Sequence, residues 1–266
     1  MKAYTNNELM TVAVSRELRD GELGFIGVGT DGRAFTLAVG IPIAAARLAQ
    51  LSHAPNFTIF WNNLLSPDLD RIPPHLTQHY LTKWPCAYQP VNSQDKNEML
   101  ARGRFDVSFD SAPQIDQYGN LNITAIGEYR HPKVRLVGCL AQPDHFAFVK
   151  RPIIVTDLKK RTFVEKVDFI TSVGYLHGGN SRVEAGLLPY GPWKVITDKC
   201  VFDFAQDTKR MRICSLHPGV TLEEVLEEMS FRPLVPEALP ETPEPTPEQI
   251  RAIREEIDPN HELLRA

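Results

Sequence analysis

Residues 21–61 read GELGFIGVGTDGRAFTLAVGIPIAAARLAQLSHAPNFTIFW, and this stretch decides the fold. Its two ends, 21–29 and 57–61, are short apolar runs typical of buried strands. Between them, Pro42 stands in the first turn of an alanine-rich helix that should end near His53. A strand, a helix and a second strand in this order predict a parallel pair joined by a right-handed crossover.

Further elements are predicted on both sides of this unit. A capped helix begins near Thr5 and ends before Gly21. Later strand candidates are 105–109, 121–126, 133–141, 151–158 and 163–172, followed by a hairpin over 193–219 and a capped helix over 221–229. Residues 64–97 are dotted with prolines and predict long loops with one short helix. With 266 residues, 42% of them hydrophobic, the chain fits an open, mostly parallel α/β sheet flanked by helices.

The C-terminal end predicts a separate element. Residues 232–247 hold six prolines, too many for a helix or a strand, and so predict a linker or arm. A final helix over 248–258 carries isoleucines on one face and should dock on the body or on a partner. We therefore expect an α/β domain over residues 1–231 and a proline-rich arm with a helix over 232–266.

Composition argues against several classes of protein. The formal charge is −4 and the basic residues form no long stripe, so no nucleic-acid partner is expected. No stretch approaches the roughly 18 apolar residues that a membrane span needs, which favours a cytoplasmic protein without a membrane partner. The four cysteines lie far apart without CxxC pairing, so reduced thiols and no metal site are expected.

Two familiar kinds of motif are not expected to carry the function. The glycines at 24, 27 and 29 give GxxGxG, which matches neither a P-loop nor the dinucleotide pattern. His53 and His217 stand in isolated turns, where a lone histidine ends an element more often than it catalyses.

The segment SAPQIDQYGNLNITAIGEYRHPKVRLVG (111–138) gathers polar residues around predicted strand ends, where open α/β sheets bind ligands. The side chains of interest are those of Gln114, Tyr118, Asn120 and Asn122. Asparagine and backbone groups there could fix a carbonyl or carboxylate without charge. The alternative is that Asp116, Gly119 and Asn120 build a tight turn, and the residue types alone favour that alternative.

The string QIDQYGNLN, followed by IGEYRHPKVRLVG, closely resembles the beta subunits of the glutaconate type of family I CoA-transferases. Other landmarks follow in the family's order: YTNNELM, GIP, LSHAPN, FVEKVDFITSVGY, VITDKCVFDF, HPGVTLEEV and IREEIDP. The resemblance covers almost the whole chain. It implies an open α/β fold, an alpha-type partner subunit in an alpha2beta2 or larger assembly, and an active site between the subunits. It also implies coenzyme A as part of the substrate and no permanently bound cofactor.

In that family the beta subunit carries a glutamate, within a Glu-Ser-Gly string, that attacks the thioester and forms covalent intermediates. The matching stretch here is IFWNNLL, where Asn62 stands at the position of the glutamate and Asn63 follows. A carboxamide is a very poor nucleophile, so the covalent route should be closed. Asp68 and Asp70 are the nearest acids, and no glutamate lies between Glu22 and Glu98.

Two further departures lie near the same expected site. The family's GxGG loop, an oxyanion site, matches residues 138–141, where Gly138 is kept, Cys139 is expected to be a buried, inert thiol, and Leu140 would narrow the space. An insertion of roughly ten residues (30–39) is also inferred from the resemblance.

Relatives without the glutamate include a steroid ring-opening hydrolase and a methylglutaconyl-CoA decarboxylase, which keep the thioester intact. The resemblance therefore implies cleavage of a carbon–carbon bond in an acyl-CoA, with the working carboxylate on the alpha chain. Two alternatives stay open: a genuine CoA-transferase subunit, and a non-catalytic scaffold for a catalytic alpha partner. We predict catalytic roles for Asn62 and Asn120. We predict substrate contacts for Asn63, Gln114, Tyr118, Asn122, Gly138 and Cys139.

Overall fold

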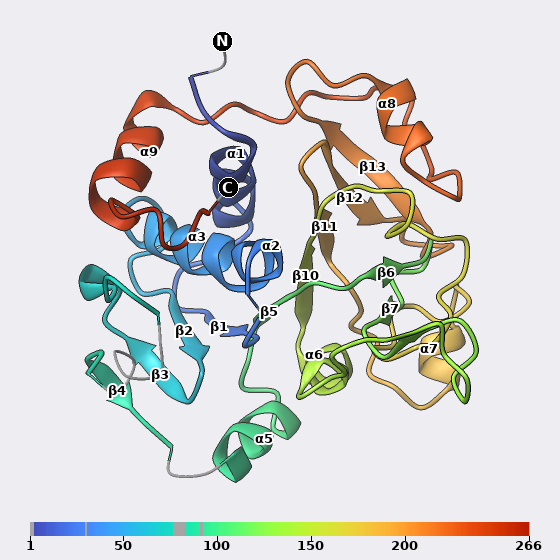
Figure 1. Ribbon diagram of the computed structural model, residues 1–266, viewed down its shortest axis with the longest axis horizontal. Helices are drawn as coiled ribbons and strands as arrows, with labels where there is room; N and C mark the ends of the chain where they lie inside the picture. Colours follow the sequence, from blue (N-terminus) through green and yellow to red (C-terminus); the bar gives the residue numbers. More distant parts are fainter. Residues whose placement is uncertain (1–2, 30, 77–82, 91–92, 266) are drawn as a thin grey trace. The chain divides into compact units, whose positions relative to one another are not determined.

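The computed structural model describes residues 3–29, 31–76, 83–90 and 93–265. The chain forms two compact units, one made of residues 1–109 with 244–266 and the other of residues 110–243 (Figure 1). The boundary predicted after residue 231 stays a prediction, since these units divide the chain at other positions.

Parallel strands form the centre of the first unit. Strand β1 (Leu23–Ile26) pairs in parallel with β2 (Thr58–Trp61) and with β5 (Val107–Asp110). The connection from β1 to β2 is helical: α2 (Arg33–Phe35) leads through a π-helical turn (Thr36–Gly40) into α3 (Ile41–Gln50). The parallel strand–helix–strand unit is thus confirmed. The insertion inferred for residues 30–39 stays a prediction; residues 33–39 are helical and lead into α3, and residue 30 lies outside the described part.

Antiparallel strands flank this centre. Strand β3 (Leu64–Pro67) pairs with β2 and with β4 (Cys86–Tyr88), and a 3-10 turn (Leu69–Arg71) lies between β3 and β4. The prediction of loops over 64–97 was therefore wrong for these two strands, because Leu65 finds its pairing partner Tyr88 far along the chain. The predicted short helix is α5 (Ser93–Ala101). Residues 77–82 and 91–92 of the predicted loops lie outside the described residues.

Both termini pack into the first unit. Helix α1 (Asn6–Ser15) begins with a capping box in which Thr5 and Glu8 exchange hydrogen bonds. Helix α9 (Pro247–Arg251) continues as a π-helical turn (Ala252–Ile257), and Ile250 packs with Tyr4 and Leu9. The expectation that the last helix docks on the body is confirmed. Figure 1 shows α9 beside α1 and α3.

The second unit holds a four-stranded group. Strand β10 (Arg151–Val155) pairs in parallel with β11 (Lys194–Ile196), and β12 (Cys200–Phe204) and β13 (Met211–Leu216) follow in antiparallel order. Helix α8 (Leu222–Glu227) is capped by Thr221 as predicted. The proline-rich arm then runs beside β13, where the backbone of Leu234 accepts from Ile213 and donates to Met211. The predicted open α/β fold is confirmed.

Short elements complete the second unit. They are β6 (Gln114–Ile115), β7 (Leu121–Asn122), β8 (Ala125–Ile126), β9 (Val134–Arg135), α6 (Gln142–Phe148) and α7 (Ser181–Glu184). The predicted strand over 133–141 shrinks to the two residues of β9, and the left-handed φ of 80° at Gly138 rules out a regular strand at that position. The predicted strand over 163–172 is reduced to isolated bridges at Phe163 and Ser172. No helix in the described part of the chain is both long and apolar enough to cross a bilayer.

Candidate functional site

Asn62 and Asn63 form the two-residue turn between β2 and β3. Trp61 pairs with Leu64 on either side of the turn, and the φ angles of Asn62 and Asn63 are 48° and 65°. Positive φ at both central residues is the pattern of a type I′ hairpin turn, which asparagine tolerates. Both residues are half-buried, and neither amide hydrogen-bonds to any residue that the structure describes. The carboxyl end of β2 therefore presents two amides that can bind solvent or a ligand.

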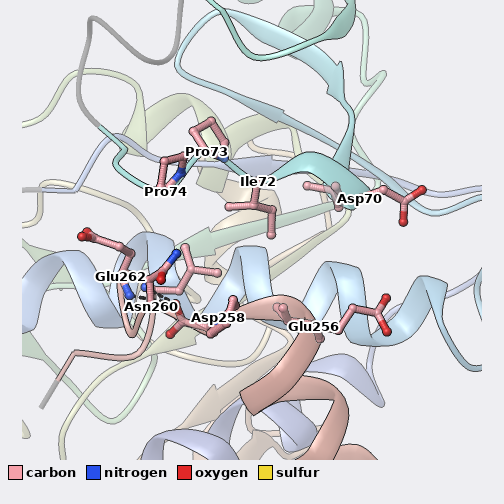
Figure 2. A pocket seen from close by; sticks show the side chains of 12 residues that line it. Asp70, Ile72, Pro73, Pro74, Glu256, Asp258, Asn260 and Glu262 are labelled. Carbon is pink, nitrogen blue, oxygen red and sulfur yellow. Dashed lines mark hydrogen bonds between the residues drawn. The ribbon is translucent and has the colours of Figure 1, made fainter.

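The acids nearest to this turn in the sequence are engaged by other parts of the first unit. Asp68 caps the 3-10 turn, since its carboxylate accepts from the backbone N–H of Asp70 at 3.0 Å. The carboxylate of Asp70 forms an ion pair with Arg47, which also pairs with Glu256 at 3.0 Å. Asp70 and Glu256 line a small hollow of about 80 Å³ (Figure 2). No residue of the turn itself supplies a carboxylate.

Trp61 ends β2 immediately before the turn. Its side chain is buried, its indole N–H donates to the carbonyl oxygen of Gly27 at 3.0 Å, and its ring meets Trp84 edge-on at 6.1 Å. Glycine suits the second position of a type I′ turn. A Glu-Ser-Gly string laid on this hairpin with its glycine at Asn63 would therefore put the glutamate at Trp61, one residue before Asn62. Whether the family's glutamate aligns with Asn62 or with Trp61, this chain has no carboxylate at that position.

Gln114 and Asn122 form a buried polar network in the second unit. The amide nitrogen of Asn122 donates to Gln114 Oε1 and to the carbonyl of Ala125, both at 2.7 Å. Asn122 Oδ1 accepts from the backbone N–H of Thr124 at 2.9 Å. Gln114 Nε2 donates to Asp168 Oδ2 at 2.9 Å. The donors of both amides are thus directed at protein atoms.

Asn120 is engaged in the same way and is 1% exposed. Its amide nitrogen donates to both carboxylate oxygens of Asp116 and to the carbonyl of Leu176, and its oxygen accepts from the N–H of Gly174 at 2.9 Å. Burial raises the pKa of Asp116, partly offset by hydrogen bonds from Asn120 and Tyr118. These contacts describe the tight turn that was the alternative for this loop. A catalytic role for Asn120 stays a prediction.

Tyr118 lies on the wall of a hollow in the second unit. The hollow measures about 670 Å³ and is lined, among others, by Asp116, Lys166, Leu176 and His177. Leu176 has a φ of 51°, an uncommon conformation for leucine, and its carbonyl is held by Asn120. Tyr118 therefore lies beside a cavity, and its contact with substrate stays a prediction.

Gly138 and Cys139 lie in an exposed segment. The N–H of Gly138 donates to the carbonyl of Ile123 at 2.9 Å, so this group is already used by the protein. The expectation of a buried Cys139 was wrong, because the chain leaves the strand there and Cys139 is exposed. Leu140 is 81% exposed, and no atom lies within 4 Å of a Cβ placed on Gly138.

The predicted residues divide between the two units. Asn62 and Asn63 belong to the first, and the other six belong to the second. Within the second unit the structure joins Gln114 to Asn122, and Asp116 joins Tyr118 to Asn120. No group of three or more potential metal ligands occurs within the described ranges.

The glycines after β1 do contain the dinucleotide spacing, contrary to the sequence interpretation. Gly27, Gly29 and Gly32 form G-x-G-x-x-G, whereas glycines 24, 27 and 29 do not. Gly29 and Gly32 have φ angles of 62° and 61°, so the backbone itself requires glycine at both positions. A dinucleotide site of this type also needs an acid near the end of the second strand, where this chain has tryptophan and asparagine. The glycines of this motif are therefore explained by the backbone conformation of the loop and not by a dinucleotide site.

Two buried polar groups gave no signal in the sequence. His145 Nδ1 lies 2.9 Å from Asp110 Oδ1, and both side chains are buried. Arg182 is 1% exposed and donates to four backbone carbonyls, those of Phe146, Val173, Gly174 and Leu188. Burial lowers the pKa of Arg182 to about 10. The contacts of His145 with Asp110 and of Arg182 with Phe146 join residues about 35 positions apart, so no local pattern predicts them.

The profile of the Coenzyme A transferase family matches residues 7–228. The chain belongs to this family. The beta subunit of 3-oxoadipate CoA-transferase from Pseudomonas knackmussii is 35% identical over 96% of this chain and 94% of that protein. The beta subunit of glutaconate CoA-transferase from Acidaminococcus fermentans is 32% identical over 98% of this chain and 96% of that protein. The crystal structure of that enzyme gives a TM-score of 0.83 at 30% identity, covering 99% of this chain and 98% of that chain.

A third relative of this chain is named for a different reaction. The cholesterol ring-cleaving hydrolase IpdB subunit of Mycobacterium tuberculosis is 34% identical, over 61% of this chain and 64% of that protein. The resemblance drawn from the sequence motifs is thus confirmed at the level of the family. The relatives of this chain thus include two transferase subunits and one ring-cleaving hydrolase subunit.

Proposed function

We propose that this chain is the beta-type subunit of a heteromeric enzyme that cleaves a carbon–carbon bond in an acyl-CoA, by hydrolysis or decarboxylation. In this proposal an alpha-type subunit supplies the working carboxylate, the assembly is alpha2beta2, and the enzyme acts in the cytoplasm. The observation that carries the proposal is the β2–β3 hairpin, where Trp61, Asn62 and Asn63 provide no carboxylate.

The chemistry follows from what an amide can and cannot do. A carboxamide does not displace coenzyme A to form a covalent intermediate, but its N–H group can donate to a thioester carbonyl or orient a water. A polarised thioester stabilises negative charge on the adjacent carbon when a carbon–carbon bond breaks. The free amides of Asn62 and Asn63 are suited to that polarisation. Coenzyme A is then part of the substrate, with no permanent cofactor.

A second candidate is a genuine CoA-transferase subunit. The two transferase beta subunits match this chain over 96% and 98% of its length, whereas the ring-cleaving relative matches over 61%. In that case the acyl-carrying carboxylate must come from the alpha-type subunit, because the hairpin has none. The transferase forms a covalent thioester between an enzyme carboxylate and coenzyme A during turnover. The enzyme that cleaves a carbon–carbon bond forms no such enzyme-bound thioester.

The test uses the co-expressed complex with dicarboxylic, keto-acyl and cyclic acyl-CoA substrates. We expect carbon–carbon cleavage without exchange of labelled coenzyme A between two acids, and no borohydride-trapped adduct on either chain. A trapped adduct on the alpha-type chain with coenzyme A exchange would support the transferase, and an adduct on this chain would overturn the central premise.

Substitutions in the asparagine turn test whether this chain takes part in catalysis or only supports a catalytic partner. Asn62→Ala and Asn63→Ala should each lower kcat by about 10- to 1,000-fold, as expected for losing a donor to a developing negative charge. Asn56→Ala is the matched control, because that exposed amide pairs with Asp20 in the same unit. Unchanged turnover for both turn variants would favour a scaffold role for this chain.

A further inference from the structure

Residues 123–140, which we name the 123–140 hairpin, form one antiparallel hairpin in the second unit. The backbone closes it at three levels: Lys133 N–H donates to Ile126, Leu136 to Thr124, and Gly138 to Ile123, at 2.9–3.0 Å. Strands β8 and β9 form its middle. The hairpin is thus a defined structural element with little buried surface of its own.

Residues outside the hairpin fix its conformation. Asn122 accepts from the N–H of Thr124, and the hydroxyl of Thr124 lies 2.7 Å from that of Thr171. The carboxylate of Asp168 accepts from the N–H of Gly127 at 3.0 Å. The ring of Tyr129 stacks on Phe169 at 4.9 Å. The polar network of Gln114 and Asn122 therefore holds an exposed element in one conformation, which lowers the entropic cost of binding through it.

The hairpin exposes several large apolar side chains. Leu140 and Val137 are 81% and 72% exposed, while no other large hydrophobic side chain in the described ranges exceeds 52%. Tyr129 and Val134 add two more exposed apolar groups in the same segment. A cluster of this kind on one rigid element marks an interaction site better than scattered surface residues do.

The hairpin is also basic. Arg130, Lys133 and Arg135 are exposed, and Glu128 is the one acid of the segment. Arg135 lies over the ring of Tyr129 at 5.4 Å. A local positive charge stands out in a chain whose formal charge is −4. A segment that exposes both apolar and cationic side chains fits a protein surface that is apolar and carries carboxylates.

A rival patch exists on the second unit. Val183, Leu188, Tyr190 and Trp193 are also exposed, but to a smaller extent. The indole of Trp193 is flanked by Arg151 at 6.0 Å and Lys194 at 5.9 Å, so part of its surface already has an intramolecular partner. Tyr129 of the hairpin is partly covered as well, so the exposure of Val137 and Leu140 makes the 123–140 hairpin the stronger candidate.

We infer that the 123–140 hairpin is the docking element for the alpha-type subunit, whose matching surface is apolar and bordered by acidic side chains. The inference rests on the proposed function for the existence of that partner. Docking through the hairpin buries Val137 and Leu140 at the centre and places Arg130, Lys133 and Arg135 at the rim. It also brings Gly138 and Cys139 to the subunit interface.

The test measures assembly without substrate. This chain is co-expressed with its cognate alpha-type subunit, and the dissociation constant of the heteromer is measured by native mass spectrometry on dilution. Val137→Asp and Leu140→Asp should weaken assembly about 30-fold or more, as for central interface residues. The double variant Lys133→Glu/Arg135→Glu should slow association most at low salt. Val183→Asp and Val235→Asp are matched controls on exposed valines and should change the constant less than twofold.

Hydrogen exchange gives an independent readout on the unmodified complex. Amides of residues 128–140 should become protected when the alpha-type subunit binds. Circular dichroism and thermal unfolding of each variant alone verify that the second unit is intact. Normal assembly of the folded Leu140→Asp variant, protection confined to 183–193, self-association through the hairpin, or failure of any alpha-type subunit to bind would each overturn the inference.

Failure of the two proposals can be told apart. If the wild-type complex forms a thioester on this chain but Leu140→Asp dissociates it, the proposed reaction fails and the docking inference stands. If the wild-type complex cleaves carbon–carbon bonds and the hairpin variants assemble normally, the docking inference fails and the proposed reaction stands.

Discussion

The indole N–H of Trp61 donates a hydrogen bond to the carbonyl oxygen of Gly27 at 3.0 Å. This bond joins the last residue of β2 to the loop that follows β1, two chain segments that leave the sheet at the same edge. The asparagine turn begins directly after Trp61. The indole therefore fixes the position from which Asn62 and Asn63 are presented.

The first prediction concerns this hydrogen bond. Trp61→Phe removes the donor, leaves the carbonyl of Gly27 without it and creates space beside Trp84, so we expect a loss of about 2–4 kcal/mol in the free energy of unfolding. Urea denaturation at pH 7 measures it. The comparison variant Trp84→Phe loses a similar bond to the carbonyl of Asp68. Turnover should fall more for Trp61→Phe than for Trp84→Phe; equal losses of turnover would speak against a role in presenting the turn.

The second prediction separates the conformation of the turn from its chemistry. Asn63 has a φ of 65°, which glycine adopts without strain, so Asn63→Gly should leave the unfolding free energy within about 0.5 kcal/mol of the wild type. Asn63→Val should lose about 1–3 kcal/mol, because a β-branched residue is strained there. If the amide is functional, Asn63→Gly loses turnover while keeping stability. Full activity of Asn63→Gly would show that only the turn matters.

Sequence periodicity predicted the elements that depend on local pattern. Helix α1, the parallel pair β1 and β2, and the docked C-terminal helix follow from apolar spacing, caps and prolines. Strand β4 could not be predicted in this way, because its partner β3 lies about 20 residues away in the sequence and prolines interrupt the pattern. Strand β3 pairs with β2 through the two-residue asparagine turn, a local signal that the prolines after it obscured.

The candidate site was harder to predict than the fold. Asn62 and Asn63 could have been recognised as a hairpin turn, since two asparagines between apolar runs are a turn signal. The role of Asn120 could not be predicted in full, because Gly174 and Leu176 approach it from more than 50 residues away. The partners of Asn122 are local, but Gln114, which it contacts, is held by Asp168 from 54 residues away.

The third prediction concerns Arg182, whose guanidinium is enclosed by backbone carbonyls. Arg182→Met leaves the carbonyls of Phe146, Val173, Gly174 and Leu188 without that donor, so we expect a loss of about 3–5 kcal/mol. Arg182→Lys keeps a charge but offers three donors without the planar geometry, and should recover less than half of the loss. Denaturant unfolding measures both, with exposed Arg161→Met as a control expected within about 0.5 kcal/mol. A small effect of Arg182→Met would mean that water replaces the guanidinium.

The fourth prediction concerns thiol reactivity. Cys139 is exposed, whereas burial raises the pKa of the Cys200 thiol, so iodoacetamide at pH 8 should label Cys139 at least 100-fold faster than Cys200. Peptide mass spectrometry of the native chain measures the two rates. Cys200 should react only after unfolding. Comparable rates for the two native thiols would contradict the burial of Cys200.

The last prediction concerns acid stability. Glu8 is buried, which opposes ionisation, but hydrogen bonds from Arg254 and Thr5 outweigh burial and hold its pKa below the usual value. Arg254 Nε and Nη2 lie 2.6 and 2.9 Å from the two carboxylate oxygens. A lowered folded-state pKa gives stability that is fully present above the unfolded-state value of about 4.3 and is lost as the pH falls through the folded-state value.

Glu8→Gln should therefore lower the unfolding free energy by about 1–3 kcal/mol at pH 7, because it removes charged hydrogen bonds that join α1 to the C-terminal helix. The difference from the wild type should shrink as the pH falls below 4.3, since protonation removes the same charge from the wild-type side chain. Urea unfolding from pH 7 down to pH 3 measures it. Glu255→Gln serves as a control, because that glutamate is exposed and lies in the same C-terminal helical segment as Arg254. A difference that stays constant from pH 7 to pH 3 would show that the carboxylate of Glu8 stabilises the termini by shape and not by charge.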